Sequence, residues 1–185
     1  MKLNRILAVG LAVVFAATLA LAEESAIKSG PQVGEDLAGP FHPLNVTGSK
    51  AGEKACLYCS NGSNPVAMIF AKEATPELGK LLKKIDGCVE KNADCKMGSF
   101  VVFCSDDDGL EAKAKKLAKD NDLKNVVLSI DNPAGPKGYN VNKDADITVV
   151  LYKDRNVKAN YTFKKGELTE KGIEKVLEGT SKITK

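Results

Sequence analysis

The chain has 185 residues, 43% of them hydrophobic and 28% charged, which is enough for one ordinary domain with its own core. Its 27 basic and 24 acidic residues are scattered along the sequence and give a net charge of only +3. This near balance excludes a basic stripe of the kind that a phosphate backbone requires, so we expect no nucleic acid partner.

Residues 1 to 22 have the composition of a cleavable secretion signal. Lys2 and Arg5 supply positive charge, an uncharged run from Ile6 to Ala20 follows, and Ala20-Leu21-Ala22 places small residues at the positions that signal peptidase recognises. The apolar run is shorter than the roughly 20 residues of a membrane-spanning helix. Cleavage lowers the net charge to +1, because both charges lost are basic. We predict an exported protein, periplasmic or extracellular, that has no membrane contact once the signal is removed.

Residues 23–54 are rich in Gly, Pro and Ser and are predicted to form an extended lead-in segment before a domain of residues 55–185. The clearest apolar anchors of this segment are Phe41 and Leu44. His42, the only histidine, lies between them, so any Cys-His catalytic pair would depend on the lead-in.

The regular part begins with a strand followed by a helix. The apolar run from Val66 to Ala71 is typical of a strand covered on both faces. Thr75 offers a capping oxygen and Pro76 suits the first helical position. The apolar residues at helical spacing are Leu78, Leu81, Leu82, Ile85 and Val89.

The alternation of strands and helices then repeats. Residues 100–104 and 126–130 predict two further buried strands, with a helix at about 108–120 between them. After a Pro- and Gly-rich break, residues 147–152 predict a fourth strand, and the alternation at residues 157–163 indicates a half-exposed antiparallel edge strand. Thr169 is placed to cap a last helix.

This order, β-α-β-α-β followed by β-β-α, makes the first three strands parallel under the right-handed crossover rule. It resembles the thioredoxin fold, and residues 31–48 look like the segment before the first core strand of exported thioredoxin-like and peroxiredoxin-like proteins. The resemblance implies an α/β, thioredoxin-like three-layer sandwich: a mixed sheet with helices on both faces.

Cys56-Leu57-Tyr58-Cys59 has the C-x-x-C spacing of thiol-disulfide oxidoreductases, in which one thiolate attacks and the second resolves the mixed disulfide. The pair precedes the first core strand, whereas the family's pair follows that strand and begins a helix. The residues from Ser60 to Pro65 predict a turn, which would leave neither sulfur at a helix N-terminus.

The positions that carry chemistry in the family are occupied by other residues. Residues 72–78, after the first core strand, contain no cysteine, and Leu78 stands where the Thr-Pro-x-Cys of peroxiredoxins has its cysteine. Near the fourth strand, Asp146-Ile147-Thr148 lacks the family's cis-proline. The chain is therefore identified as a thioredoxin-like protein without the usual active-site cysteines and cis-proline.

The topology predicts that Cys56, Cys59, Cys88 and Cys95 lie near one end of the sheet, because the first helix returns toward the start of its strand. Four thiols could form two disulfides in any of three pairings, or a four-cysteine zinc site. The exported compartment favours disulfides.

Cys104, the fifth cysteine, is predicted at the end of the second buried strand, at the opposite end of the sheet. Two interpretations are a small apolar residue in a packed strand end and a lone free thiol. The acidic run from Asp106 to Asp108 argues against a reactive thiol, since negative charge suppresses the thiolate.

Three functional hypotheses remain. The first is an exported thioredoxin-fold protein with a modest thiol-disulfide role, in which Cys56 and Cys59 are the redox pair and protein thiols or disulfides are the partners. The second is a non-catalytic binding or structural module whose cysteines are held in disulfides. The third is the four-cysteine zinc site. No nucleotide-binding glycine motif occurs in the sequence, and no cofactor is expected.

Overall fold

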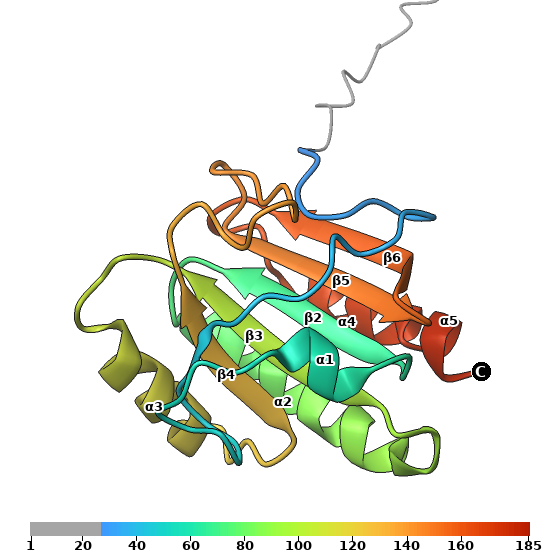
Figure 1. The fold of residues 1–185 in the computed structure, drawn as a ribbon, viewed down its shortest axis with the longest axis horizontal. Helices are drawn as coiled ribbons and strands as arrows, with labels where there is room; N and C mark the ends of the chain where they lie inside the picture. The colour runs from blue at the N-terminus through green and yellow to red at the C-terminus, as the bar shows by residue number, and fades with distance from the viewer. Residues whose placement is uncertain (1–26) are drawn as a thin grey trace, which may run out of the picture.

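The structure, a computed structural model, describes residues 27–185 (Figure 1). The predicted signal of residues 1 to 22 lies outside the described residues. A six-stranded mixed sheet forms the centre, with strand order β1-β4-β3-β2-β5-β6. The strands are β1 (Leu44–Asn45), β2 (Val66–Ala71), β3 (Gly98–Cys104), β4 (Val126–Asp131), β5 (Ile147–Lys153) and β6 (Asn156–Phe163).

The first three core strands are parallel and β6 is an antiparallel edge strand, as predicted. β2 is parallel to β3, and β3 is parallel to β4. On the other side of β2, β5 and β6 are each antiparallel to their neighbour. β1 adds a short antiparallel strand beside β4, at the far edge. The prediction of an α/β fold with a mixed sheet is confirmed.

The helices are α1 (Leu57–Asn61), α2 (Pro76–Lys91), α3 (Leu110–Asp120), α4 (Glu170–Gly179) and α5 (Ser181–Thr184), with a 3-10 turn, η1 (Ala93–Cys95), after α2. Thr75 caps α2 and Thr169 caps α4, each hydroxyl accepting a backbone N–H of the first turn. Both caps confirm the sequence prediction. Among residues 27–185, no helix has the length and hydrophobicity to cross a membrane.

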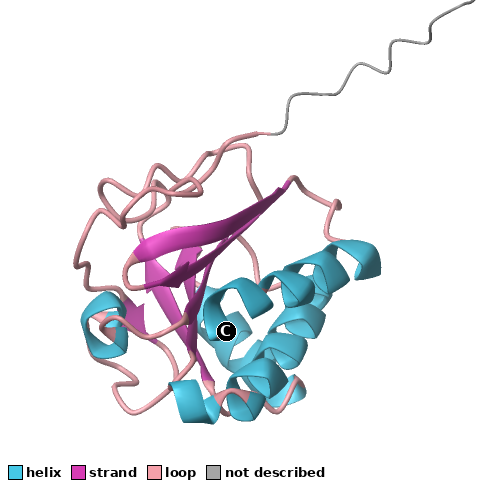
Figure 2. Ribbon diagram, turned by 90° about the vertical axis from the view of Figure 1, so that its right-hand side faces the viewer, coloured by secondary structure: helices cyan, strands magenta, loops and turns pink. Residues whose placement is uncertain are grey.

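The sheet separates two hydrophobic clusters. Along β2, Ala67, Ile69 and Ala71 pack on one face and Val66, Met68 and Phe70 on the other, as strand alternation requires. The first face carries the apolar sides of α2, α3, α4 and α5, while the second is covered by α1 and by loops (Figure 2). Helices therefore lie on both faces, as predicted, and the long ones share one face.

The described part of the lead-in runs across the second face. Leu37 and Phe41 are buried there, and the Phe41 ring packs against Tyr139 with a centroid distance of 4.9 Å. Further upstream, the Ser29 hydroxyl accepts a hydrogen bond from Thr148 of β5 at 2.7 Å. The lead-in thus covers the side of the sheet that no long helix covers.

A buried carboxylate links α2 to the start of β4. Asp86 is 5% exposed and accepts the backbone N–H groups of Lys124, Asn125 and Val126 at 2.9, 2.6 and 3.1 Å. The Asn125 side chain donates a fourth hydrogen bond at 3.2 Å. One side chain therefore satisfies three consecutive backbone donors and holds the entry into β4 against the helix.

Candidate functional site: the Cys56–Cys59 disulfide and its cleft

Cys56 and Cys59 are bonded to each other, with an S–S distance of 2.02 Å and a Cα–Cα distance of 5.2 Å. Cys56 is the N-cap residue of α1, and its Sγ accepts a hydrogen bond from the Cys59 backbone N–H at 3.0 Å. The prediction of a plain turn after Cys59 is therefore wrong. The turn begins only at Gly62, whose positive φ of 56° ends the five-residue helix.

The two cysteine residues differ in their exposure. Cys59 is exposed, whereas Cys56 is half-buried and packs against the hydrophobic cluster of the second face. Cys59 is therefore the more accessible cysteine of the pair. Cys56 is the one that holds a hydrogen bond from a backbone donor.

The two residues between the cysteines anchor α1 to the sheet. Leu57 and Tyr58 are both buried, at 6% and 9% exposure. The guanidinium of Arg155, in the turn between β5 and β6, lies 4.8 Å from the centre of the Tyr58 ring, within the range of a cation–π contact. The hairpin and the hydrophobic cluster thus hold the disulfide in place from beneath.

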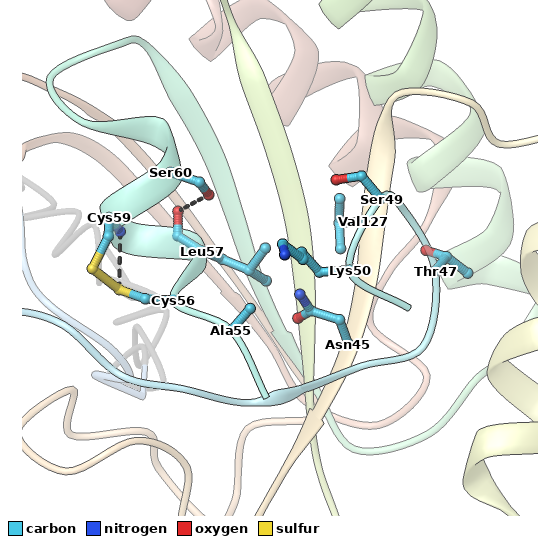
Figure 3. A pocket seen from close by; sticks show the side chains of 10 residues that line it. All are labelled: Asn45, Thr47, Ser49, Lys50, Ala55, Cys56, Leu57, Cys59, Ser60 and Val127. Carbon is cyan, nitrogen blue, oxygen red and sulfur yellow. Dashed lines mark hydrogen bonds between the residues drawn. A yellow bond between two sulfur atoms is a disulfide. The ribbon is translucent and has the colours of Figure 1, made fainter. Parts of the chain in front are cut away.

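A cleft of about 430 Å³ opens beside the disulfide (Figure 3). One wall comes from α1 with Cys56, Leu57 and Cys59, and the facing wall comes from the lead-in and from Val127 of β4. Figure 3 shows the disulfide at one side of the view and the Lys50 ammonium nearer its centre. The cleft therefore joins an accessible disulfide to a surface that a second molecule can occupy.

Cys88 and Cys95 do not join this site. Both are free and half-buried, and they pack against the first face, whereas Cys56 packs against the second, so the sheet separates the two pairs. No group of three or more metal-ligating side chains occurs among residues 27–185. The prediction that the four thiols lie together is therefore wrong. The four-cysteine zinc site and the disulfides between the two pairs are wrong with it. The topology predicted the end of the sheet near which these cysteines lie, but not the face against which each one packs.

Cys104 is a free, buried thiol at the end of β3. Burial raises its pKa to about 12, with a smaller contribution from Asp131, its neighbour on β4, against a lowering by Lys72. The acidic neighbour is therefore Asp131 rather than the run from Asp106 to Asp108. This thiol acts as a small apolar side chain.

Cys104 should resist alkylation in the native protein. A thiol with a pKa of about 12 holds almost no thiolate at pH 8, so we expect its labelling by iodoacetamide to be at least a hundredfold slower than in the urea-unfolded protein. Since the folded state raises this pKa, the thiol favours folding below pH 9 and loses that contribution as the pH rises toward 12. Native labelling at the unfolded rate would contradict this.

The carboxyl end of β2 carries charged residues in place of cysteine. A second cleft, of about 520 Å³, is lined there by residues that include Lys72, Glu73, Thr75 and Lys113. Close by, burial and then the charge of Glu73 raise the pKa of Asp146. The described residues that line this cleft include no thiol, whereas the Cys56–Cys59 disulfide lies at α1.

Solved structures of low sequence identity share the fold. The peroxidoxin BcpB from Mycobacterium tuberculosis aligns with a TM-score of 0.57 and 17% identity over 85% of this chain and 98% of that one. An uncharacterized conserved protein from Geobacillus kaustophilus aligns with a TM-score of 0.59 and 12% identity, over 85% of this chain and 82% of that one. A secreted disulfide oxidoreductase of Mycobacterium tuberculosis aligns with a TM-score of 0.52 and 10% identity, over 76% of this chain and 94% of that one. The chain has the thioredoxin-like fold, as the element order predicted.

Comparison by sequence finds no such relatives. No protein-family model matches the chain, and no curated protein matches it. The arguments about function therefore rest on the chain's own residues.

Sequence reasoning found the cysteine pair but missed its surroundings. No motif in the sequence marks Lys50, Asn45, Val127 or Arg155 as neighbours of the pair. The one local signal for α1 was the buried pair Leu57-Tyr58 inside the motif, because two adjacent apolar residues at the N-terminus of a short helix can anchor it.

Proposed function

We propose that this chain is an exported thiol–disulfide exchange protein whose redox pair is Cys56 and Cys59. The observation that carries the proposal is a formed disulfide with one exposed cysteine, at the side of an open cleft. A structural neighbour of the same fold is a secreted disulfide oxidoreductase, which supports the class of chemistry. The partners are protein thiols in the compartment to which the predicted signal directs the chain.

The first step is attack by a substrate thiolate on the Sγ of Cys59. A bond forms between the substrate sulfur and Cys59, the bond between Cys59 and Cys56 breaks, and Cys56 leaves as a thiolate. The backbone N–H of Cys59 donates to the Cys56 sulfur and stabilises the negative charge left there. The exposure of Cys59 and the stabilisation of the Cys56 thiolate thus both favour attack on Cys59.

A second thiolate of the substrate completes the exchange. It attacks the substrate sulfur of the mixed disulfide and releases Cys59 as a thiolate, so the substrate dithiol becomes a disulfide and the protein pair becomes a dithiol. The reverse sequence reduces a substrate disulfide. We expect modest rates, because Lys50 is the one cation among the described residues that line the cleft, and its 60% exposed side chain is strongly screened by water.

The size of the disulfide loop argues for exchange rather than for a structural cross-link. The two cysteines are only three positions apart in sequence. In the chain-entropy model, closing so short a loop stabilises the folded state by about 2 kcal/mol, less than the bridges that close long loops. Opening this bond therefore costs less stability than opening a long-loop bridge, and the folded domain can tolerate that loss during a reaction.

The proposal is tested by titrating the purified mature protein with a mild dithiol. We expect the Cys56–Cys59 bond to open and to be re-formed by a peptide disulfide, as measured by mass mapping of alkylated cysteines. The urea midpoint should fall by about 1 M on reduction, because about 2 kcal/mol is lost and the urea dependence of a domain of this size is about 2 kcal/mol/M. A Cys56→Ser/Cys59→Ser variant is the control for reagents that react with Cys88 or Cys95. A bond that resists the dithiol in the folded protein would instead identify a non-catalytic module.

A further inference from the structure

The cleft beside the disulfide has one charged lining residue. Of the described residues that line it, Lys50 alone is charged, and the others are apolar, hydroxyl, amide or cysteine side chains. Its ammonium lies toward the centre of the cleft in Figure 3. A molecule bound in this cleft with a carboxylate near Lys50 gains a favourable contact, and one with an ammonium there is repelled.

Lys50 is free to change partner. Its contact with Glu53 is 3.5 Å long, and the two side chains are 60% and 63% exposed. Exposed pairs of this kind are weak, since water screens them and long side chains lose rotational freedom on pairing. A carboxylate held in the cleft can therefore compete with Glu53 for the ammonium.

Asn45, on β1, offers a second contact. The residue is 2% exposed and lines the cleft, yet its Oδ1 has no hydrogen-bond partner among the described residues. A buried acceptor without a donor is costly, and a ligand that supplies an N–H removes that cost. The backbone amide of a peptide is a donor of this kind.

We propose that this cleft binds the peptide segment next to the substrate cysteine and selects segments with an Asp or Glu one or two residues from that cysteine. Lys50 is the specificity-determining residue, and Asn45 accepts a main-chain N–H of the bound peptide. The proposal rests on the redox function proposed above for Cys56 and Cys59. The cleft of about 430 Å³ lies within the size range of small-ligand sites and suits a short segment rather than a folded surface.

The test uses three cysteine peptides that differ only beside the cysteine, with Asp, Asn or Lys. Exchange rates are measured with the oxidised full-length mature protein at low salt, and every rate is divided by the thiolate fraction of the attacking thiol, because an adjacent Asp raises and an adjacent Lys lowers the pKa of that thiol. We expect the Asp peptide to react about five to ten times faster than the Lys peptide, with the Asn peptide between them, and the ratio to shrink at 0.5 M salt. Equal rates for all three peptides would overturn the selectivity while leaving the exchange function intact.

Variants of the charged residues locate the effect. Lys50→Gln should remove most of the preference, Lys50→Glu should reverse it, and Glu53→Gln should increase it, because the ammonium then lacks its competitor. Lys175→Gln, an exposed lysine of α4 on the other side of the sheet, changes the net charge equally and should keep the wild-type ratio. A ratio that responds alike to Lys50→Gln and Lys175→Gln would overturn the role of Lys50.

Two further experiments distinguish peptide binding in the cleft from a general electrostatic effect of charged thiols near the disulfide. Mercaptoacetate and cysteamine carry opposite charges but no peptide group, so their rate ratio should be smaller than that of the peptides.

The Asn45→Leu variant tests the second contact. It should raise the half-saturating concentration of the Asp peptide several-fold, while the urea midpoint of the variant stays at or above that of the wild type, since a buried unpaired acceptor is removed. A small-thiol ratio equal to the peptide ratio would overturn the peptide site. No reaction with any thiol would instead refute the redox function itself.

Discussion

A monothiol that attacks the oxidised protein should form its mixed disulfide on Cys59 and leave Cys56 as the free thiol. Cys59 is exposed and Cys56 is half-buried, so the approach favours Cys59. The leaving sulfur is then Cys56, which holds the backbone N–H hydrogen bond at 3.0 Å. Because both factors act in one direction, we expect adducts on Cys59 to exceed adducts on Cys56 at least tenfold.

The adduct is measured by trapping. The protein is mixed with a monothiol and excess iodoacetamide, quenched with acid and digested, and the modification on each cysteine is read by mass spectrometry. We expect the monothiol on Cys59 and carbamidomethyl on Cys56 of the same molecules. Adducts divided equally, or mostly on Cys56, would contradict the assignment of Cys59 as the entry sulfur.

The same assignment predicts how substitutions of the two cysteines change the rate of exchange. Cys59→Ser removes the sulfur that is attacked and prevents the intramolecular disulfide, so exchange with dithiol peptides should fall at least a hundredfold. With a peptide disulfide as substrate, Cys56→Ser should also lose turnover but should accumulate a stable mixed disulfide on Cys59, because the Cys59 thiolate opens the substrate disulfide and no resolving thiol remains to release it. Ser60→Ala, which changes a neighbouring exposed side chain of α1, controls for damage to the helix. Exchange that persists in the Cys59→Ser variant would refute the assignment of Cys56 and Cys59 as the redox pair.

The largest effect on stability is expected at Asp86. Asp86→Ala leaves the three backbone donors of residues 124–126 without their acceptor and should lower the free energy of unfolding by about 3 kcal/mol. Asp86→Asn keeps one acceptor oxygen and should lose roughly half as much.

Urea unfolding followed by circular dichroism measures both changes. Glu90→Ala, an exposed acidic residue on the same helix, is the matched control and should stay within about 0.5 kcal/mol of wild type. If Asp86→Ala matched Glu90→Ala, the carboxylate would not hold the entry into β4.

The regular elements could be predicted from the sequence because several local signals agree at each of them. The start of α2 illustrates this: Thr75 supplies a cap, Pro76 suits the first helical position, and the apolar spacing gives the buried side. The continuous apolar run of β2 likewise indicated a strand covered on both faces. Such agreement leaves few competing structures, and the thioredoxin-like order of strands and helices could therefore be predicted from the sequence.

The surroundings of the disulfide could not be predicted in the same way. α1 is too short for a helical period to appear, and its anchors, Tyr58 and Arg155, are almost 100 residues apart. The separation of Cys88 from Cys56 also depends on which face each segment covers. Tertiary packing decides these features, and no local pattern encodes them.

The lead-in segment has a consequence for the order of folding. The Ser29 hydroxyl accepts hydrogen bonds from the Asn142 backbone N–H and the Thr148 hydroxyl, and the Asn160 side chain of β6 donates to the Ser29 carbonyl. These contacts span more than 110 residues, so a chain made from its N-terminus cannot complete the second face until β6 has left the ribosome. Its hydrophobic cluster stays uncovered through most of synthesis, and we expect slow, late closure and a need for protection from aggregation in that interval.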